Sequence, residues 1–171
     1  MSGTLYVVAT PLGNLEDLTT RAIRILRESD LIACEDTRHT RNLLNHIGSV
    51  AATLSYHEHN EASRAVDLLN RLREGKSIAL VSDAGTPLVS DPGYRLVSLA
   101  RAAALPVVPI PGPSALTAAV SVSGLPTDRI LFLGFLPKRA GLRRRQLREA
   151  RHLRATLVLY VAPYQILSLL R

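Results

Sequence analysis

Residues 78–93 read IALVSDAGTPLVSDPG, and this stretch decides the expected fold. The apolar run 78–81 is short, continuous and followed by turn residues, which predicts a buried strand. In open α/β sheets, ligands bind just beyond the carboxyl ends of such strands. Gly85 lacks a Cβ atom, so the backbone there can approach a ligand closely. The alternative is a structural turn that Asp83 closes with an Asx hydrogen bond.

The same pattern recurs along the N-terminal part of the chain. Short apolar runs predict strands at 5–9, 31–34, 52–56, 78–81 and 107–110, with amphipathic helices between them. Strands that alternate with helices predict a mainly parallel, doubly wound α/β sheet. The five strands are followed by TPLGN, EDTRHT, HEHN, SDAGTP and PGPSA. Because the carboxyl ends of parallel strands share one edge, these loops predict a binding rim.

The pattern changes after Ala115. Strands are predicted at 130–135 and 156–161, separated by a basic helix over 140–153. We expect an N-terminal α/β domain over residues 1–112 and the start of a second, incomplete α/β domain over 113–171. Two strands bury a sheet poorly by themselves. We therefore expect a longer protein, or a partner, to complete the second domain.

Composition indicates an ordinary globular protein. The 171 residues are 47% hydrophobic and include a single cysteine, Cys34, which lies in an apolar run and is expected to be buried. One thiol forms no internal disulfide, which fits a reducing compartment. The N-terminus has no signal-peptide pattern, and no apolar run approaches the ~20 residues of a spanning helix. A cytoplasmic protein without a membrane segment is expected.

The charge is concentrated in one segment. Residues 138–154 contain eight Lys and Arg against one acid, which accounts for the whole net charge of +7. Such a segment predicts contact with nucleic-acid phosphates, with a solvated helix face as the alternative. We expect the RNA-contacting residues to be Arg38, His39, Arg143, Arg144, Arg145 and Arg148.

Several standard sites are missing from the sequence. It has no P-loop consensus, no dinucleotide fingerprint after the first strand and no nucleophile elbow. His57 and His59 have no third ligand at metal spacing, so no metal is expected. What remains is a rim of loops that expose their backbone. Such a rim suits a cofactor with its own reactivity, and a sulfonium methyl donor fits because transfer mainly requires alignment.

Six motifs occur in a recognisable order: TPLGNLEDLT (10–19), LIACEDTRHT (31–40), HEHN (57–60), ALVSDAGTPLVSDPGY (79–94), VPIPGPSA (108–115) and GFLPK (134–138). Together they resemble the tetrapyrrole-methylase superfamily of S-adenosylmethionine-dependent methyltransferases, in particular its ribosomal RNA methyltransferases. The resemblance implies 2′-O-methylation of a cytidine in small-subunit ribosomal RNA, free or in the assembled subunit. It also implies a homodimer and a cofactor held in the cleft between two α/β domains.

The resemblance further implies which residues bind S-adenosylmethionine. They are Pro11, Asp83, Ala84, Gly85, Thr86, Pro87, Val89, Ser90, Pro113, Ser114 and Ala115. The motifs SDAGTP and PGPSA contain most of these residues, and they follow strands that we expect to be adjacent. A helix-capping role is the alternative for Ser114, and for Asp91 a cap before Pro92 is the leading expectation.

The catalytic residues are not evident from the sequence. Glu35 and Asp36 lie in a rim loop and are candidates for the general base, with an ion pair to Arg38 or Arg41 as the alternative. After Tyr160 the family usually has a Tyr-Glu-Ser-x-His-Arg run, whereas this chain continues with VAPYQ. Two rival functions stay open: a small-molecule tetrapyrrole methylase, which shares the fold, and a non-catalytic RNA-binding factor, which the missing run suggests.

Overall fold

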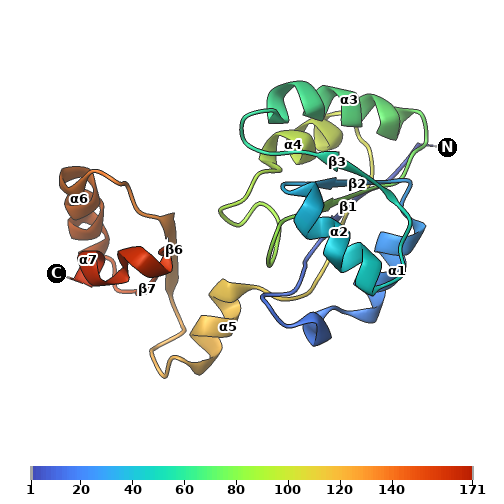
Figure 1. Ribbon diagram of the computed structural model, residues 1–171. Helices are drawn as coiled ribbons and strands as arrows, with labels where there is room; N and C mark the ends of the chain where they lie inside the picture. Colours follow the sequence, from blue (N-terminus) through green and yellow to red (C-terminus); the bar gives the residue numbers. More distant parts are fainter. Residues whose placement is uncertain (1, 171) are drawn as a thin grey trace. The chain divides into compact units, whose positions relative to one another are not determined.

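The computed structural model describes residues 2–170 (Figure 1). The chain divides into two compact units, residues 1–115 and residues 116–171. This division lies just after the domain boundary expected at residue 112. Unit 1 contains β1 (Leu5–Val8), η1 (Leu15–Asp17), α1 (Thr20–Glu28), β2 (Leu31–Cys34), α2 (Thr37–His46), β3 (Ala52–Ser55), α3 (Glu61–Arg73), β4 (Ile78–Val81), α4 (Tyr94–Ala102) and β5 (Val107–Ile110).

The sheet of unit 1 is parallel throughout its described strands. Its strand order is β3-β2-β4-β1-β5, and Leu5 of β1 pairs with Ile78 of β4 on one side and Val107 of β5 on the other. The expectation that β4 and β5 are adjacent is therefore wrong. Strand β1 lies between β4 and β5, so the helical connection from β4 to β5 has to cross it. The carboxyl ends of β4, β1 and β5 consequently lie next to one another.

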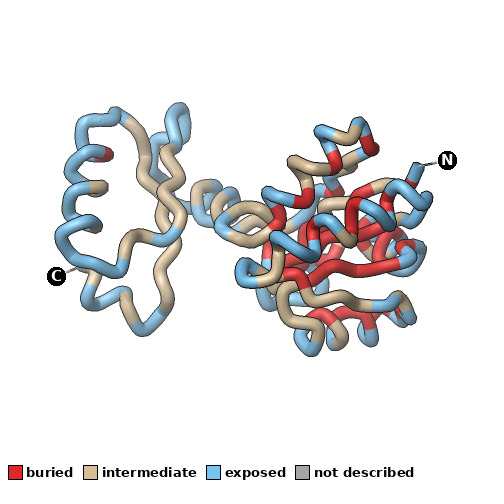
Figure 2. The backbone as a smooth tube through the Cα atoms, turned by 90° about the horizontal axis from the view of Figure 1, so that it is seen from above, coloured by how far each residue is buried: buried red, intermediate tan, exposed pale blue. Residues whose placement is uncertain are grey.

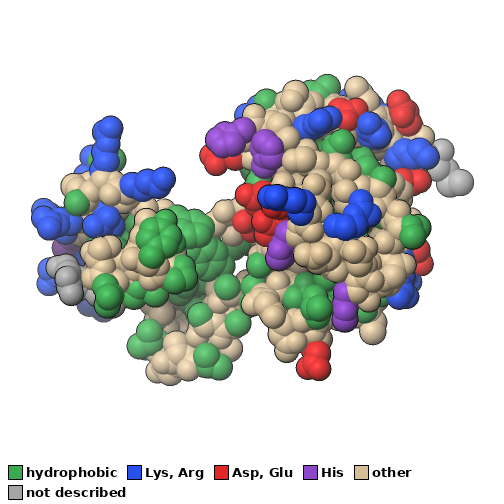
Figure 3. Space-filling view, viewed as in Figure 1, with side chains coloured by type: hydrophobic (Ala, Val, Ile, Leu, Met, Phe, Trp, Pro, Cys, Tyr) green, Lys and Arg blue, Asp and Glu red, His purple; other side chains and the backbone are tan. Residues whose placement is uncertain are grey.

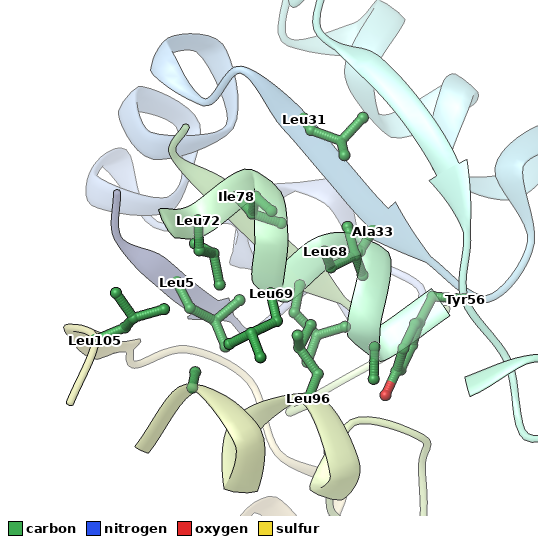
Figure 4. Packing of buried hydrophobic residues seen from close by; sticks show 13 residues of the cluster. Leu5, Leu31, Ala33, Tyr56, Leu68, Leu69, Leu72, Ile78, Leu96 and Leu105 are labelled. Atoms are coloured by element: carbon green, nitrogen blue, oxygen red, sulfur yellow. The ribbon is translucent and has the colours of Figure 1, made fainter. Parts of the chain in front are cut away.

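Helices cover both faces of this sheet. Strand β4 is a continuous apolar run, so it places apolar side chains on both faces. Ile78 and Leu80 of β4 pack with α3 and α4 in one buried cluster (Figure 4). Ala79 and Val81 point the other way and pack with α1 and α2 in a second cluster. Successive side chains of a strand point to opposite faces, so each strand contributes to both clusters. Figure 1 shows the two helix pairs on opposite sides of the sheet, confirming the doubly wound α/β prediction.

Local chemistry explains where the helices begin. Thr19 caps α1, because its hydroxyl oxygen accepts a hydrogen bond from the amide of Ala22 at 3.1 Å. The expectation that Asp91 caps the next helix is wrong. Helix α4 begins only at Tyr94, and Gly93 precedes it with a φ of +138°. A Cβ atom on Gly93 would lie 2.8 Å from Leu88 Cδ1, so the loop folds back onto the core there.

Unit 2 is smaller and much less buried. It contains β6 (Ile130–Phe135), α6 (Ala140–Arg151), β7 (Thr156–Tyr160), η2 (Pro163–Gln165) and α7 (Ile166–Leu170), and α5 (Ala115–Val122) begins at the boundary. Strands β6 and β7 are parallel. Of the described residues 116–169, only Ala150 is buried, a contrast with unit 1 that Figure 2 shows. Across residues 2–170, no helix is long and apolar enough to cross a membrane.

Candidate functional site

Three loops converge at the carboxyl edge of β1, β4 and β5. The amide of Thr10 donates to the carbonyl of Gly85 at 2.9 Å, and the amide of Gly85 donates back to Thr10 at 3.0 Å. The Thr10 hydroxyl also donates to the carbonyl of Ser82 at 3.1 Å. This reciprocal pairing holds the loop after β1 against the loop after β4.

The loop after β5 joins the same place. The hydroxyl of Thr86 donates to the carbonyl of Pro113 at 3.0 Å. A Cβ atom on Gly85 would lie 3.1 Å from Leu12 Cδ2 and 3.9 Å from the Pro113 carbonyl oxygen. Glycine thus permits a closeness of backbone that a side chain would disturb. We call residues 10–12, 82–90 and 112–115 the three-loop site.

All eleven residues that the sequence predicted for cofactor binding belong to the three-loop site. Strands β4 and β5 are not adjacent, yet their loops meet over the end of β1 through Thr86 and Pro113. Pro11, Gly85 and Pro87 are buried in the loop framework, whereas Ala84, Ser90 and Ala115 are exposed. The structure therefore separates residues that build the loops from residues that face solvent.

The backbone of residues 85–93 is unusual. Leu88 and Ser90 have φ angles of +71° and +68°, and Gly85 and Gly93 are also in the left-handed region. For a non-glycine residue that region costs on the order of 1–2 kcal/mol. Such conformations persist where the surrounding structure holds them, and they cluster at ligand sites. The side chain of Leu88 supplies part of that hold by packing on the α3–α4 cluster.

Asp36, one of the two candidate bases, is engaged in holding α2. Its Oδ1 accepts hydrogen bonds from the amides of Arg38 and His39, at 2.8 and 3.4 Å, and its Oδ2 lies 3.2 Å from Arg38 Nη2. These hydrogen bonds from Arg38 lower the pKa of the Asp36 carboxyl. The ion pair with Arg38 was the expected alternative to a catalytic role. The Asp36 amide also donates to Asp83 Oδ1 at 3.2 Å, which links α2 to the three-loop site.

An acidic pocket lies beside the three-loop site. It has a volume of about 350 Å³ and is lined by Ser90, Pro92, Gly93, Tyr94 and four acids, Glu35, Glu58, Glu61 and Asp91. Acidic side chains gather on this face of unit 1 (Figure 3). Burial raises the pKa of Glu35, and the charge of Asp83 adds to this effect. Burial and then Glu35 raise the pKa of Asp91 to about 6.

Sequence reasoning missed the place of Asp91 in this pocket. The Asp-Pro dipeptide is typical of a helix start, and that local pattern hid the alternative. A signal was present in the near repeat SDAG and SDPG, which gives Asp91 the same setting as Asp83.

His57, His59 and Cys34 do not line the acidic pocket. His57 Nε2 accepts a hydrogen bond from Asn60 Nδ2 at 3.2 Å, and the His57 ring meets that of His59 edge-on with centroids 5.9 Å apart. Within residues 2–170, no three His, Cys, Asp or Glu side chains are grouped to hold a metal ion. Cys34 is buried in the core, and burial raises the pKa of its thiol.

The predicted RNA-contacting residues occur in both units. Arg38 and His39 are exposed at the start of α2, whereas the other four lie on α6. Arg144, Arg145 and Arg148 are exposed, and Arg145 lies 3.8 Å from Glu149. Arg143 is half-buried and donates to the carbonyl of Lys138 at 3.4 Å. Helix α6 thus presents an exposed basic face with a single acidic neighbour.

The fold and the loop geometry define a class: a doubly wound α/β protein whose loops converge at the carboxyl edge of a parallel sheet, the edge at which ligands bind in such folds. Residues 4–171 match the family of Tetrapyrrole (Corrin/Porphyrin) Methylases, and the chain belongs to this family.

Sequence relatives are more specific in name. The chain is 55% identical to a ribosomal RNA small subunit methyltransferase I of Xylella fastidiosa, over 96% of this chain and 60% of the relative. It is 52% identical to the protein of that name from Halalkalibacterium halodurans, over 96% of this chain and 57% of the relative. The chain thus spans little more than half the length of these relatives.

Solved structures support the fold assignment. A uroporphyrin III C-methyltransferase from Thermus thermophilus aligns with a TM-score of 0.64 and 24% identity, over 99% of this chain and 76% of that one. A diphthine synthase aligns with a TM-score of 0.65 and 18% identity, over 95% of this chain and 66% of that one. At these identities the likeness concerns the fold alone.

Proposed function

We propose that the protein containing this chain transfers a methyl group from S-adenosylmethionine to the 2′-hydroxyl of a cytidine in small-subunit ribosomal RNA. The observation that carries the proposal is the convergence of the loops after β1, β4 and β5 through Thr10, Gly85, Thr86 and Pro113. The relatives' shared name supports ribosomal RNA as the acceptor. The cytidine and its 2′-hydroxyl rest on the motif resemblance.

The three-loop site fits the cofactor by its chemistry. Gly85 keeps a Cβ atom away from the place where the loops are closest, and the half-buried Asp83 offers a carboxylate next to exposed backbone. We propose that Pro11, residues 83–87, Val89, Ser90 and residues 113–115 hold S-adenosylmethionine. When bound, this cofactor supplies a methyl group already activated on a sulfonium. The protein then has to align the acceptor hydroxyl and exclude water.

The acceptor hydroxyl must also lose its proton. Asp36 is committed to capping α2, so we favour Glu35 over Asp36 for this task. Glu35 and Asp91 line the same pocket, and burial raises the pKa of both carboxyls. A carboxylate with a raised pKa is a stronger base near neutral pH. We propose that this pair receives the proton.

The partners follow from the same resemblance. We propose that the target is presented by small-subunit ribosomal RNA or by the assembled subunit, and that Arg38, His39 and the arginines of α6 contact its phosphates. Homodimerisation and a cytoplasmic location are part of the proposal.

The test is transfer of a tritiated methyl group from S-adenosylmethionine to small ribosomal subunits from cells that lack the protein. The full-length protein should label the RNA, and a 2′-O-methyl group should make the adjacent phosphodiester resistant to alkali. Subunits from cells that have the protein serve as the control, because their site is already filled. Cofactor binding without any transfer to deficient subunits would contradict the proposal.

A tetrapyrrole methylase is the second candidate, because the family and a fold neighbour carry that name. The basic segment 138–154 argues for RNA instead. Affinity for RNA should fall steeply with salt, since phosphate binding releases counterions. Methylation of uroporphyrin III, with no labelling of RNA, would establish a tetrapyrrole methylase instead.

The third candidate, a non-catalytic RNA-binding factor, is favoured by the sequence VAPYQ at 161–165. Calorimetry with S-adenosylmethionine separates it from the two enzymes. A methyltransferase should bind the cofactor, whereas a binding factor should give no heat.

A further inference from the structure

Unit 2 has a pocket of its own, formed by the end of β6, the start of α6, the end of β7 and the segment of η2 and α7. Its volume is about 480 Å³. The lining combines aromatic rings with cations, chiefly Phe135, Lys138, Arg143, Tyr160 and Tyr164. We call it the aromatic-basic pocket.

Two of the three aromatic side chains that line this pocket are exposed. Tyr164 is 83% exposed and Phe135 is 61% exposed. Phe135 meets Tyr160 edge-on at 5.6 Å, and Phe132 meets the same ring at 4.8 Å. Tyr160 is thus held by two aromatic neighbours, while the accessible surfaces of Phe135 and Tyr164 are available to a ligand. Figure 3 shows hydrophobic side chains gathered on the surface of unit 2. Exposed apolar patches can mark interaction sites.

The charge of the pocket selects for an anion. Lys138 and Arg143 both line it, and the hydrogen bond from Arg143 Nη1 to the Lys138 carbonyl holds the guanidinium at its wall. No acid is present among the described residues that line it, in contrast to the four acids of the pocket in unit 1. Arg144, Arg145 and Arg148 of α6 are also exposed, which adds positive charge to the surface of unit 2.

Rings beside cations suit single-stranded nucleic acid. Unstacked bases pack on aromatic side chains, while Lys and Arg neutralise the adjacent phosphates. A duplex offers no free base faces, so it satisfies only the cations. Gln165 also lines the pocket and carries an amide that can both donate and accept hydrogen bonds at a base edge.

We propose that the aromatic-basic pocket binds an unstacked nucleotide of single-stranded RNA, with its base on Tyr164 and Phe135 and its phosphate on Lys138 and Arg143. This inference rests on the proposed RNA acceptor and adds a recognition site for a single-stranded segment of it. The charge of the pocket and its accessible rings together favour this occupant over a protein segment.

The test compares three variants of the full-length protein, Tyr164→Ala, Tyr164→Phe and Leu167→Ala. The probe is a fluorescein-labelled mixed-sequence RNA strand, either free or annealed to its complement. Tyr164→Ala should weaken binding of the free strand about five- to a hundred-fold, the range of one lost stacking contact. Tyr164→Phe keeps the ring and should keep the affinity. Leu167 is exposed on α7 but does not line the pocket, so Leu167→Ala controls for changes in the helix.

Two further readouts sharpen the result. Duplex affinity should change little in Tyr164→Ala, because the duplex presents no free base. Lys138→Ala should lower the salt dependence of single-strand binding by about 0.7 in the logarithmic slope, the value for one phosphate contact. Thermal unfolding followed by circular dichroism should be the same for Tyr164→Ala and Leu167→Ala.

Two outcomes would overturn the inference. One is equal single-strand affinity in Tyr164→Ala and Leu167→Ala. The other is a change in sedimentation of Tyr164→Ala with RNA binding intact, which would mean that another protein surface covers this face. Calorimetry with S-adenosylmethionine keeps the two proposals apart. If the wild type does not bind S-adenosylmethionine, the proposed methyltransferase function is contradicted. The RNA affinities of the variants test the aromatic-basic pocket independently of that result.

Discussion

Gly85 shows how much of the three-loop site depends on a single residue. Its φ of +85° favours glycine, and its missing side chain leaves room for Leu12. Gly13 also has a positive φ, at +111°, but a Cβ atom there would meet nothing within 4 Å. Alanine at either position would strain the backbone, but only at Gly85 would the added Cβ atom also crowd a neighbour.

Gly85→Ala and Gly13→Ala should each lower the free energy of unfolding by about 1 kcal/mol, because each puts a Cβ atom on a left-handed backbone. Gly85→Ala should in addition weaken binding of S-adenosylmethionine, since Leu12 must move within the site. Urea unfolding and calorimetry measure the two effects. Equal cofactor affinity in both variants would show that the crowding at Gly85 is irrelevant to binding.

Asp91 should make stability depend on pH. Its pKa is raised from 3.8 to about 6 by burial, then by Glu35, with a smaller contribution from Asp83 and an opposing hydrogen bond with Ser82. Between these values the folded state keeps a proton that the unfolded state has released. The contribution of Asp91 is therefore most favourable below its unfolded pKa and is lost as the pH rises through its folded pKa.

Asp91→Asn removes this loss. Relative to the wild type, the variant should gain free energy of unfolding between about pH 4 and about pH 7, as measured by urea unfolding at both values. Glu35→Gln is the companion variant, because removing that charge should lower the pKa of Asp91 and flatten the same profile. A wild-type and variant difference that is constant with pH would contradict the raised pKa.

At the scale of elements, a side chain that caps the start of a helix is occupied by the helix amides and is less available for catalysis or binding. In the sequence, Asp36 is a candidate general base because it lies in a rim loop after a buried strand. In the structure its carboxylate satisfies the first amides of α2 and pairs with Arg38. Helix α6 is the opposite case. Its N-cap Arg139 makes no side-chain cap hydrogen bond, and its arginines extend from an exposed surface.

Substitution of Asp36 should affect folding more than chemistry. Asp36→Ala removes the cap and should lower the unfolding midpoint, whereas Asp36→Ser restores a capping oxygen and should recover much of it. Asp36→Ser should also retain methyl transfer. Loss of transfer in a serine variant that is folded and binds cofactor would reinstate Asp36 as a catalytic residue.

Reversing charge on α6 should weaken RNA binding. Arg144 and Arg148 are exposed and four residues apart, so they share one helix face. The double variant Arg144→Glu, Arg148→Glu should reduce affinity for RNA and make it less sensitive to salt. Arg73→Glu, Arg101→Glu changes the net charge equally on exposed positions of unit 1 and is the matched control. Equal losses in both pairs would indicate an effect of total charge.

At the scale of the whole molecule, the two units differ in their means of stability. Unit 1 buries two apolar clusters, one on each face of a five-stranded sheet formed by its described residues. In the described part of unit 2, the sheet has two strands and Ala150 is the one buried residue. A two-stranded sheet without a core is marginal by itself.

A fragment of residues 1–115 should therefore fold alone. It should unfold in one cooperative thermal transition by circular dichroism, because it retains both clusters. A fragment of residues 116–171 should show no such transition. Cooperative unfolding of the second fragment would contradict the assignment of stability to unit 1.

The sequence predicted the elements of unit 1 and the loops of its site because both depend on local signals. Short continuous apolar runs marked the strands, and the glycine and proline motifs marked the loops at their ends. Those same motifs led to the family. The burial of Cys34 was also predicted correctly, because the apolar run around it is a local signal.

The tertiary structure decided what depends on residues far apart in the chain. Only the pairing of Leu5 with both Ile78 and Val107 places β1 between β4 and β5. Likewise, Asp91 joins Glu35 in one pocket because α4 begins later than its Asp-Pro pattern predicts. A sequence by itself determines local conformation through turn chemistry and periodicity. Strand order and shared pockets arise from packing between distant segments, which local sequence patterns do not predict.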